Sequence, residues 1–301
     1  MLTSVRKSKE HLIYDSLWSR KELTREEWSK YRKLQLGYEG EVKFAALLKE
    51  HLTAEHIVFF DSVFDYQGSI TQIDCYIILS NKTLLIEVKN FQGVFELKDG
   101  VFTSLTTSRS YQNPLYQLHR AENNVRNLFN NVTFNLQLES YVAFVNTHFS
   151  LYAIKHEQII LPTHIIKFIQ GLNDGTSTLT EQHHTFAKQL IARHLKDNPL
   201  ERLPNYNYKS LRKGIHCSQC GQPTKRIRHH IICPQCHMKE NFKTAILRNA
   251  NELDLLFPER LITTDTMYEW TGKIISKPTI RRILSNHLSK QNRTKNVHYL
   301  L

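Results

Sequence analysis

Apolar residues recur with helical spacing near the start of the chain and with strand-like spacing after it. Residues 1–34 carry Leu, Ile, Tyr and Trp at loosely helical intervals, which predicts one or two amphipathic helices that pack on the rest of the chain. Segment 37–41 is then expected to open a further helix with a dense apolar stripe. Short β-like runs follow at 57–60, 70–79, 83–88, 94–97 and 101–105, with polar or glycine-containing breaks between them. The last break contains Asp99-Gly100, which predicts a hairpin.

A second helical stripe and further strands complete the first two thirds of the chain. Asn113-Pro114 is a favourable helix start, and the apolar stripe after it predicts a helix to about Asn130. The remaining elements are two strands and a helix, predicted at 141–145, 158–161 and 178–195. The order helix, strands, helix, strand predicts a mixed α/β core over residues 35–200, after an N-terminal helical extension over 1–34.

The last third of the chain is expected to form smaller parts behind a polar linker. A cysteine-bearing module is predicted over 210–245 and a helical tail over 246–301. The elements expected in this region are helices at 243–256, 264–270 and 276–287. Thr264-Asp265 is expected to cap the second of them, and a Thr271-Gly272 turn lies between the last two. Two helices joined by a short glycine turn resemble a helix-turn-helix. A helical pair that packs on the body or on a second subunit is equally compatible with the pattern.

The formal net charge of +12 is concentrated in this last third. Residues 201–301 hold 18 of the 40 Lys and Arg but 7 of the 28 Asp and Glu. A polyanion is the natural partner of such a tail, because each neutralised phosphate releases condensed counterions. A solvated basic face and attraction to anionic lipid are the alternatives, but no amphipathic stretch of Lys and Trp supports a membrane surface. We therefore predict nucleic acid, most naturally DNA, as the partner.

The chain shows no sign of membrane insertion or secretion. It contains no uninterrupted run of about eighteen apolar residues, and its start lacks the apolar segment and cleavage site of a signal peptide. These features predict a cytoplasmic protein with no membrane partner.

Four of the five cysteines form two Cys-x-x-Cys pairs, which are Cys217, Cys220, Cys233 and Cys236. Each pair makes a tight knuckle, and two knuckles close a tetrahedral site for one structural Zn²⁺ in a zinc ribbon. Two redox dithiols or two disulfides are the alternatives, and neither has a suitable local context. Four thiolates leave zinc no open position, which argues against a zinc-dependent hydrolase. The nearby histidines, at 216, 229, 230 and 237, are expected to lie outside the zinc shell.

Basic residues occupy two places in this region where nucleic acid could bind. Lys225, Arg226 and Arg228 fill the segment between the knuckles, where a ribbon presents its tip, and a phosphate contact there competes with a merely solvated loop. Arg281 and Arg282 lie on the last predicted helix. We predict nucleic-acid contacts at these five side chains.

An acidic and lysine-containing constellation carries the candidate chemistry of the α/β core. Glu87 and Lys89 project from the same side of a predicted strand, and Asp74 starts the apolar end of the preceding strand. A hairpin between these strands would let the two carboxylates converge, and hard oxygen ligands with open positions suit Mg²⁺ or Mn²⁺. Partial burial and a nearby metal are expected to lower the pKa of Lys89. Glu41 could add an oxygen ligand. The alternative is a surface salt bridge between Glu87 and Lys89 on an edge strand.

Four motifs together resemble the nuclease-related domain (NERD), a branch of the PD-(D/E)xK nuclease superfamily. The motifs, in order, are Gly37-Tyr38-Glu39-Gly40-Glu41, Gln72-Ile73-Asp74, Glu87-Val88-Lys89-Asn90 and Asn113-Pro114-Leu115-Tyr116-Gln117. The resemblance covers roughly residues 30–150 and implies an αβββαβ core with metal-dependent cleavage of DNA. It implies that Asp74 and Glu87 are metal ligands and that Lys89 activates water or stabilises charge. Ile73 stands where the superfamily's name has proline.

The same resemblance assigns roles to two further residues. Glu41 would be an accessory acidic residue from the first helix, and Gln117 would reach the site from the helix after the strands. The predicted function is therefore a magnesium-dependent DNA endonuclease-like phosphodiesterase with a zinc-ribbon tail that binds nucleic acid. The rival is a non-catalytic nucleic-acid-binding or regulatory protein that keeps the nuclease fold. The sequence leaves the oligomeric state open, a homo-oligomer included.

Overall fold

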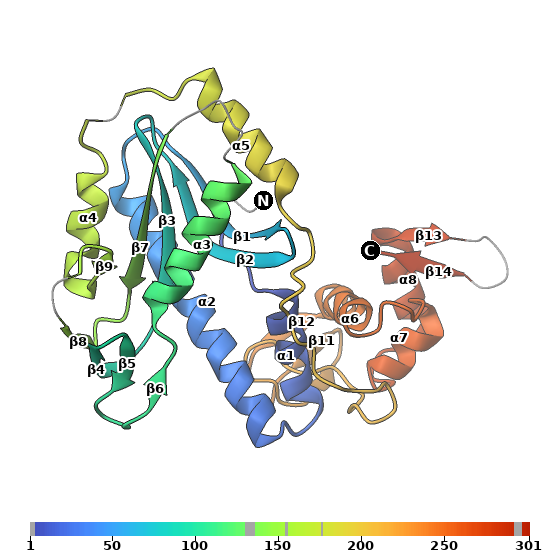
Figure 1. Ribbon diagram of the computed structural model, residues 1–301. Coiled ribbons are helices and arrows are strands. Elements are labelled where there is room, and N and C mark those ends of the chain that lie inside the picture. The colour runs from blue at the N-terminus through green and yellow to red at the C-terminus, as the bar shows by residue number, and fades with distance from the viewer. Residues whose placement is uncertain (1–3, 130–135, 154–155, 176, 292–296) are drawn as a thin grey trace. The chain divides into compact units, whose positions relative to one another are not determined.

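The computed structural model describes residues 4–129, 136–153, 156–175, 177–291 and 297–301. The predicted helix end near Asn130 therefore lies outside the described residues. The chain divides into two compact units (Figure 1). Unit 1 comprises Arg32–Glu201 and the first residues up to Lys7, and unit 2 comprises Ser8–Tyr31 and Arg202–Leu301. Among the described residues, no helix has the length and apolar character needed to cross a membrane.

The central sheet of unit 1 mixes antiparallel and parallel strands. Its order is β1-β2-β3-β7-β9, with strands β1 (Ile57–Tyr66), β2 (Ser69–Ile78), β3 (Lys82–Lys89), β7 (Gln137–Phe144) and β9 (Ile159–Ile160). The first three strands are antiparallel, which confirms the hairpin predicted between β2 and β3, whereas β3, β7 and β9 run parallel. The predicted mixed α/β core is thus confirmed.

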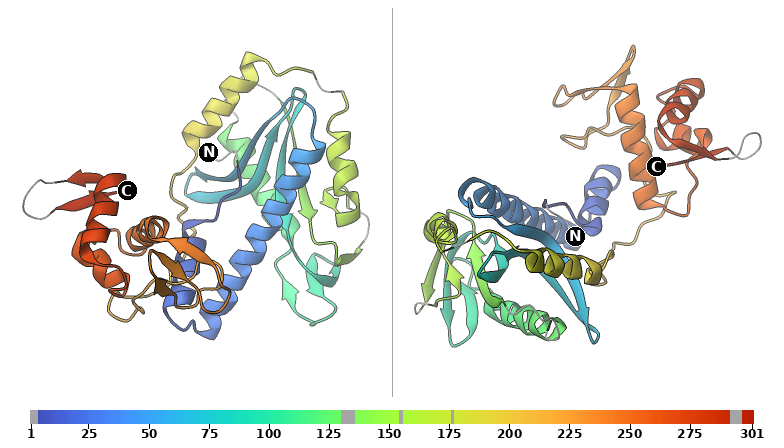
Figure 2. Two further views of the ribbon diagram at one scale, coloured as in Figure 1. Left: turned by 180° about the vertical axis from the view of Figure 1, so that it is seen from behind. Right: turned by 90° about the horizontal axis from the view of Figure 1, so that it is seen from above.

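Helices cover both faces of this sheet (Figure 2). The covering helices are α2 (Arg25–His51), α3 (Pro114–Leu128), α4 (Ile165–Gly171) and α5 (Glu181–Arg193), with a short 3-10 turn, η1 (Pro162–His164), before α4. One face of the sheet packs against α2 and α4 in a core that holds Phe44, Ile77 and Ile169. The other face packs against α3 and α5, in a core around Tyr76 and Leu118. Strand β3 is buried between the two layers.

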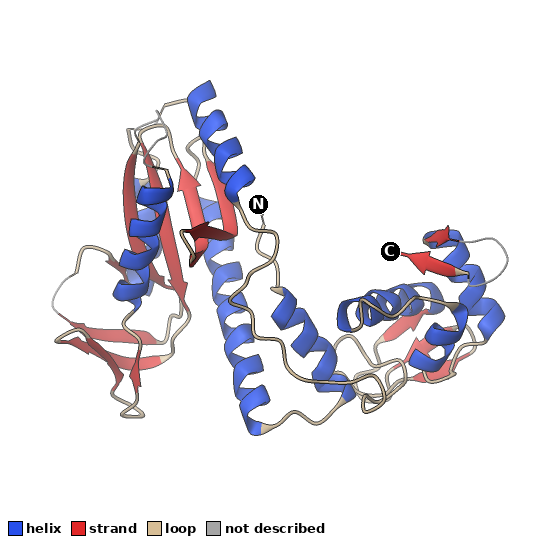
Figure 3. Ribbon diagram, turned by 45° about the vertical axis from the view of Figure 1, so that its right-hand side comes forward, coloured by secondary structure: helices blue, strands red, loops and turns tan. Residues whose placement is uncertain are grey.

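A smaller second sheet extends from the end of β3 (Figure 3). Its order is β6-β5-β4-β8, with strands β4 (Gly93–Lys98), β5 (Val101–Ser104), β6 (Ser110–Tyr111) and β8 (Phe149–Ala153). The hairpin predicted at Asp99-Gly100 is confirmed. Both turn residues adopt positive φ angles, 51° and 79°, as a tight two-residue turn requires.

Helix α2 differs from its predicted start. It runs without interruption from Arg25, so Gly37 and Gly40 lie inside the helix rather than at its beginning. A Cβ on Gly40 would lie 2.7 Å from the Cβ of Asn90, the residue after β3. The Asn90 side-chain amide also donates to the Leu36 carbonyl at 2.8 Å. The glycine therefore allows α2 to approach the end of β3, which sets the position of Glu41.

The described residues of unit 2 form helices, two small sheets and the first residues of α2. Its elements are α1 (Lys9–Arg20), β10 (Lys225–Ile227), β11 (His230–Ile232), β12 (Lys239–Asn241), α6 (Phe242–Leu256), α7 (Thr264–Trp270), α8 (Lys277–His287), β13 (Ser289–Gln291) and β14 (His298–Leu300). The three helices predicted after residue 242 are confirmed to within one or two residues. The cap of α7 is Thr263 rather than the predicted Thr264-Asp265, because the Thr263 hydroxyl accepts from the Thr266 backbone N–H.

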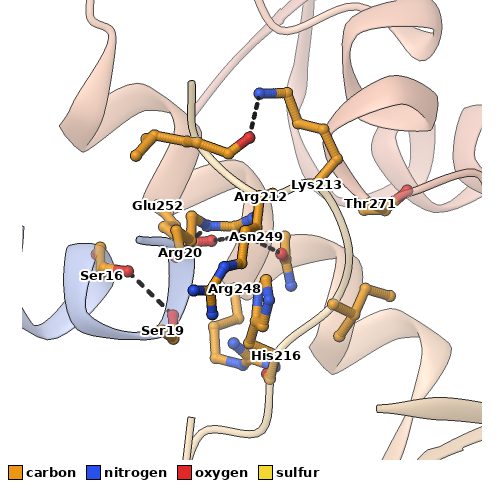
Figure 4. A network of polar contacts seen from close by, with 12 residues as sticks. Ser16, Ser19, Arg20, Arg212, Lys213, His216, Arg248, Asn249, Glu252 and Thr271 are labelled. Atoms are coloured by element: carbon orange, nitrogen blue, oxygen red, sulfur yellow. Dashed lines mark hydrogen bonds and ion pairs between the residues drawn. The ribbon is translucent and has the colours of Figure 1, made fainter. Parts of the chain in front are cut away.

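A buried polar network joins α1 to the C-terminal part of unit 2 (Figure 4). Arg20 is fully buried, and its guanidinium lies 3.8 Å from the ring centre of Trp270. The same group donates to Glu252 at 2.9 Å, to Asn249 at 3.0 Å and to the Arg212 carbonyl at 2.9 Å. Burying a guanidinium is tolerated when its donors are satisfied in this way. Residues 8–31 of the predicted N-terminal extension over 1–34 are thus part of the same unit as the C-terminal residues.

Candidate functional site

Asp74 and Glu87 lie at the same level of two adjacent central strands. The register pairs Cys75 with Ile86, so the next level of the β2–β3 ladder holds Asp74 and Glu87. The Asp74 carboxylate accepts a hydrogen bond from the Val88 backbone N–H at 2.7 Å, which ties it to the strand that carries Glu87. The two carboxylates therefore converge as the sequence predicted.

Glu87, Lys89 and Gln117 form a closed triangle of hydrogen bonds. Lys89 Nζ donates to Glu87 Oε1 at 2.6 Å and to Gln117 Oε1 at 3.0 Å, while Gln117 Nε2 donates to the same Glu87 oxygen at 2.7 Å. The Asn113 side chain caps α3 by accepting from the Leu115 N–H, as predicted, and this fixes the first turn that presents Gln117. All three side chains thus lie together.

The burial of Glu87 excludes the alternative of a surface salt bridge. Its side chain is 2% exposed on a central strand, and Oε2 has no hydrogen-bond partner among the described residues. Leaving a buried polar atom without a partner costs about 1–3 kcal/mol, and more when the group is charged. At Glu87 the atom belongs to a carboxylate beside Asp74, where a bound cation could satisfy it.

Glu41 lies close enough to Asp61 and Glu87 for their charges to affect its pKa. Burial, together with the negative charges of Asp61 and Glu87, raises the pKa of Glu41 to about 8. Burial and repulsion by Glu87 and Glu41 likewise raise the pKa of Asp74 well above its ordinary value. Without a cation the cluster therefore holds protons at neutral pH, which a bound metal would displace.

The pKa of Lys89 is raised rather than lowered in the protein without a metal ion. Burial by itself lowers the pKa of Lys89, but attraction to Glu87 and Asp74 outweighs it, and the pKa of Lys89 is raised above the usual value. The predicted lowering depended on a nearby metal ion as well as on burial, and burial alone does not produce it. Lys89 is a cation in the metal-free site, suited to balancing negative charge.

Asp61 is a member of the cluster that was not predicted from the sequence. It stands opposite Asp74 in the β1–β2 register, between the pairs Phe60–Cys75 and Ser62–Ile73, and has a left-handed φ of 47°. Gln72 Nε2 donates to its carboxylate at 2.7 Å. The available signal was its place directly after the apolar run 57–60, an acidic residue next to an apolar strand segment as Asp74 is.

These residues fit a divalent metal ion. Mg²⁺ and Mn²⁺ are usually bound by one or two carboxylates of the protein, and water and phosphate oxygens complete the coordination of the ion. Asp74 and Glu87 offer this pair from neighbouring strands, and the unsatisfied Oε2 of Glu87 is the atom that such an ion would satisfy.

Glu41 makes the stability of the metal-free protein depend on pH. The pKa of Glu41, about 8, lies above the usual 4.5. Glu41 therefore makes its full contribution to the free energy of unfolding below about pH 4.5, and this contribution is lost as the pH rises through 8. We expect Glu41→Gln to remove this loss, so that the variant becomes more stable than the wild type at pH 9. Denaturant unfolding of metal-free protein from pH 5 to 9 measures the difference. Glu50→Gln, on the exposed side of α2, is the control, and parallel curves for wild type and Glu41→Gln would contradict the assignment.

The four predicted cysteines gather at one point in unit 2. Their Sγ atoms all lie within 4.8 Å of one another, with Cys220–Cys233 at 3.4 Å and Cys217–Cys236 at 3.5 Å. A tetrahedral Zn²⁺ with bonds of about 2.3 Å requires sulfur separations of about 3.8 Å, whereas a disulfide requires about 2 Å. All four are free thiols. In the described part of the chain, this is the one group of three or more Cys, His, Asp or Glu residues gathered so closely, and it could hold a metal such as zinc.

Both knuckles have the tight turns that bring thiols together. The Gly221 N–H donates to the Cys217 carbonyl and the His237 N–H to the Cys233 carbonyl. Gly221 has a φ of 66°, and a Cβ there would lie 2.7 Å from the Trp18 ring, so a larger residue would be strained and would displace Trp18 of α1. None of the four nearby histidines belongs to the group, as predicted from the sequence.

The predicted nucleic-acid contacts fall into two separate groups within unit 2. Lys225 and Arg226 lie on β10 and Arg228 in the turn before β11, and all three are exposed. Arg281 and Arg282 are exposed on α8. The structure brings the members of each group together but gives no contact between the groups among the described residues.

Comparison with known proteins gives one result. No curated protein and no solved structure matches the chain significantly. Glu41, Asp61, Asp74, Glu87, Lys89 and Gln117 all lie in the region that a family model recognises. Residues 36–145 of this chain match the model described as the nuclease-related domain.

Proposed function

We propose that unit 1 is a PD-(D/E)xK-type phosphodiesterase domain that cleaves DNA with Mg²⁺ or Mn²⁺. The observation that carries this proposal is the pair Asp74 and Glu87 at one level of the central sheet, with the Glu87 Oε2 buried and unsatisfied. The match of residues 36–145 to the nuclease-related domain supports the same chemistry. The rival, a protein that binds nucleic acid without cutting it, would keep the same cluster, so cleavage itself must separate the two.

The side chains of the cluster that were predicted from the sequence have distinct proposed roles. A divalent ion held by Asp74 and Glu87 would polarise a phosphate oxygen and lower the pKa of bound water. Lys89, charged and anchored by Glu87, would offset negative charge on the phosphate under attack. Gln117 would fix the direction of both groups, because it donates to Glu87 and accepts from Lys89. Glu41 would be an accessory acid, and it would release its proton when the ion binds.

We further propose that the cysteine group of unit 2 is a zinc ribbon that contacts nucleic acid. The sulfur separations near 3.5 Å fit one structural Zn²⁺, and strands β10, β11 and β12 form the small sheet between and after the knuckles. Lys225, Arg226 and Arg228 at the exposed β10–β11 turn would contact phosphates, which bind basic side chains regardless of base sequence.

Cleavage of DNA by the purified zinc-loaded protein tests the proposed function. Supercoiled plasmid, linear duplex and single-stranded DNA are incubated with Mg²⁺, Mn²⁺ or EDTA. We expect cleavage of at least one DNA form with Mg²⁺ or Mn²⁺ and none with EDTA. A protein that binds DNA and cuts none of these forms with either metal would overturn the enzymatic proposal and leave the non-catalytic rival.

A further inference from the structure

The exposed face of α8 is basic and polar. Ile280, Ile283 and Leu284 are buried in the core of unit 2, so the opposite side of the helix faces solvent. The exposed residues at helical spacing on that side are Pro278, Arg281, Arg282 and Ser285. Neither Arg281 nor Arg282 has an ion-pair partner in the described part of the chain. This face of α8 therefore carries the two positive charges of Arg281 and Arg282.

The turn before α8 holds the helix firmly on its neighbours. Helix α7 ends at the fully buried Trp270, and the connection to α8 turns through Gly272 and Lys273, which have φ angles of 66° and 61°. Ile275 in the same connection is fully buried, which anchors the turn to the core. Two packed helices joined by a short glycine turn, with the second exposing a basic face, have the arrangement of a helix-turn-helix.

A concave surface lies along this face of α8 and encloses a volume of about 830 Å³. The first turn of α7 and the strand β14 form its sides, and Figure 1 shows the β13–β14 hairpin next to α8. Asp265 is paired with Lys277 at 2.6 Å, so those two charges cancel. Arg281 and Arg282 then give the surface a net positive charge that complements a polyanion.

We propose that α8 and this concave surface bind double-stranded DNA, with α8 in the major groove. The major groove of B-form DNA accepts an α-helix, whereas the major groove of double-stranded RNA is too narrow for side chains to read. Proteins that bind single strands instead expose aromatic rings on which bases stack. The one aromatic residue among the described residues lining this surface, Tyr299, is 2% exposed and offers no such platform. The duplex therefore fits best.

This inference deepens the proposed function by naming the form of nucleic acid that unit 2 holds. Its test measures binding rather than cleavage, so either proposal can fail while the other stands. Full-length Glu87→Gln protein is titrated into a labelled 20-base-pair duplex, and the change Arg281→Ala/Arg282→Ala is added to it. The matched control is Arg202→Ala/Lys209→Ala, which removes two exposed charges of unit 2 elsewhere in the sequence.

We expect the α8 variant to bind duplex DNA at least about tenfold more weakly than the control at moderate salt. The slope of log affinity against log salt should fall by about 0.9 for each phosphate that is no longer neutralised, up to about 1.8 in total. The affinity for single-stranded DNA and for double-stranded RNA of the same sequence should fall much less. Equal losses of affinity in the α8 and control variants, no loss in either, or an equal loss for all three nucleic acids would overturn the proposal.

A second substitution tests whether a folding defect, rather than the loss of the two charges, weakens DNA binding. Zinc content and the unfolding transition are measured for each protein, and Arg281→Gln/Arg282→Gln, which keeps long polar side chains on the helix, repeats the titration. The proposal requires this variant to fold as the parent does and to lose duplex binding like the alanine variant. A glutamine variant that folds and binds duplex DNA as tightly as the control would contradict it.

Discussion

Glu87→Gln is expected to abolish metal-dependent DNA cleavage while leaving the protein folded. The substitution keeps the shape of the side chain but removes the charge that a divalent ion needs, and it leaves Lys89 without its anionic partner at 2.6 Å. Loss of residues that only support a metal ligand lowers activity or affinity by about 10- to 100-fold, so loss of a direct ligand should exceed about a hundredfold. Initial rates of plasmid cleavage over a range of Mg²⁺ concentrations measure the effect.

A carboxylate outside the cluster supplies the matched control for this prediction. Glu96→Gln, on strand β4, should cleave at the wild-type rate. Zinc content and circular dichroism should be the same for both variants and the wild type. If Glu87→Gln cuts as fast as Glu96→Gln, the assignment of the site is wrong, even if the protein is a nuclease.

Replacing Cys217 and Cys220 by serine is expected to remove zinc and unfold the ribbon. Structural zinc contributes about 10–16 kcal/mol of apparent binding free energy to a small module, more than such a module can lose and stay folded. The first knuckle packs on Trp18 through Gly221, and the core of unit 2 includes Ile215 and Ile231 from the ribbon. We therefore expect the double serine substitution to expose Trp18 to solvent and to lower the stability of unit 2.

Metal analysis, tryptophan fluorescence and thermal unfolding together measure this result. The wild type should hold one zinc per chain, and the double variant none, with red-shifted fluorescence and a separate transition retained for unit 1. Cys75→Ala, which removes the fifth cysteine from the core of unit 1, should keep the full zinc content. A wild type prepared without chelator that contains no zinc, or a double variant that retains it, would contradict the prediction.

Features encoded by short spacing were predictable from the sequence. The Glu87-x-Lys89 pair on a strand, the hairpin at Asp99-Gly100 and the two Cys-x-x-Cys knuckles each depend on neighbours within a few residues. Their local geometry is the same wherever such a segment folds. The convergence of Asp74 with Glu87 required one additional assumption, a single hairpin between adjacent strands.

Features that depend on distant contacts were not predictable. Gly37 and Gly40 suggested a helix start, but α2 runs through both. Gly40 instead lets the helix approach Asn90, fifty residues later in the chain. The network of Arg20 with Asn249 and Glu252 joins segments more than 200 residues apart and leaves no periodic trace in the sequence. Asp61 comes after an apolar run, but its place in the cluster depends on the β1–β2 register.

Titration of the zinc-loaded protein with Mn²⁺ at pH 8 tests the acidic cluster as a metal site most directly. The pH is chosen because the pKa of Glu41 is about 8 in the metal-free protein, and protons compete with the metal at lower pH. Electron paramagnetic resonance of free Mn²⁺ counts bound ions without requiring turnover. We predict saturable Mn²⁺ binding to the wild type that is lost in both Asp74→Asn and Glu87→Gln and kept in Glu96→Gln. Equal Mn²⁺ binding by all four proteins, or none by the wild type, would contradict a metal site at this cluster.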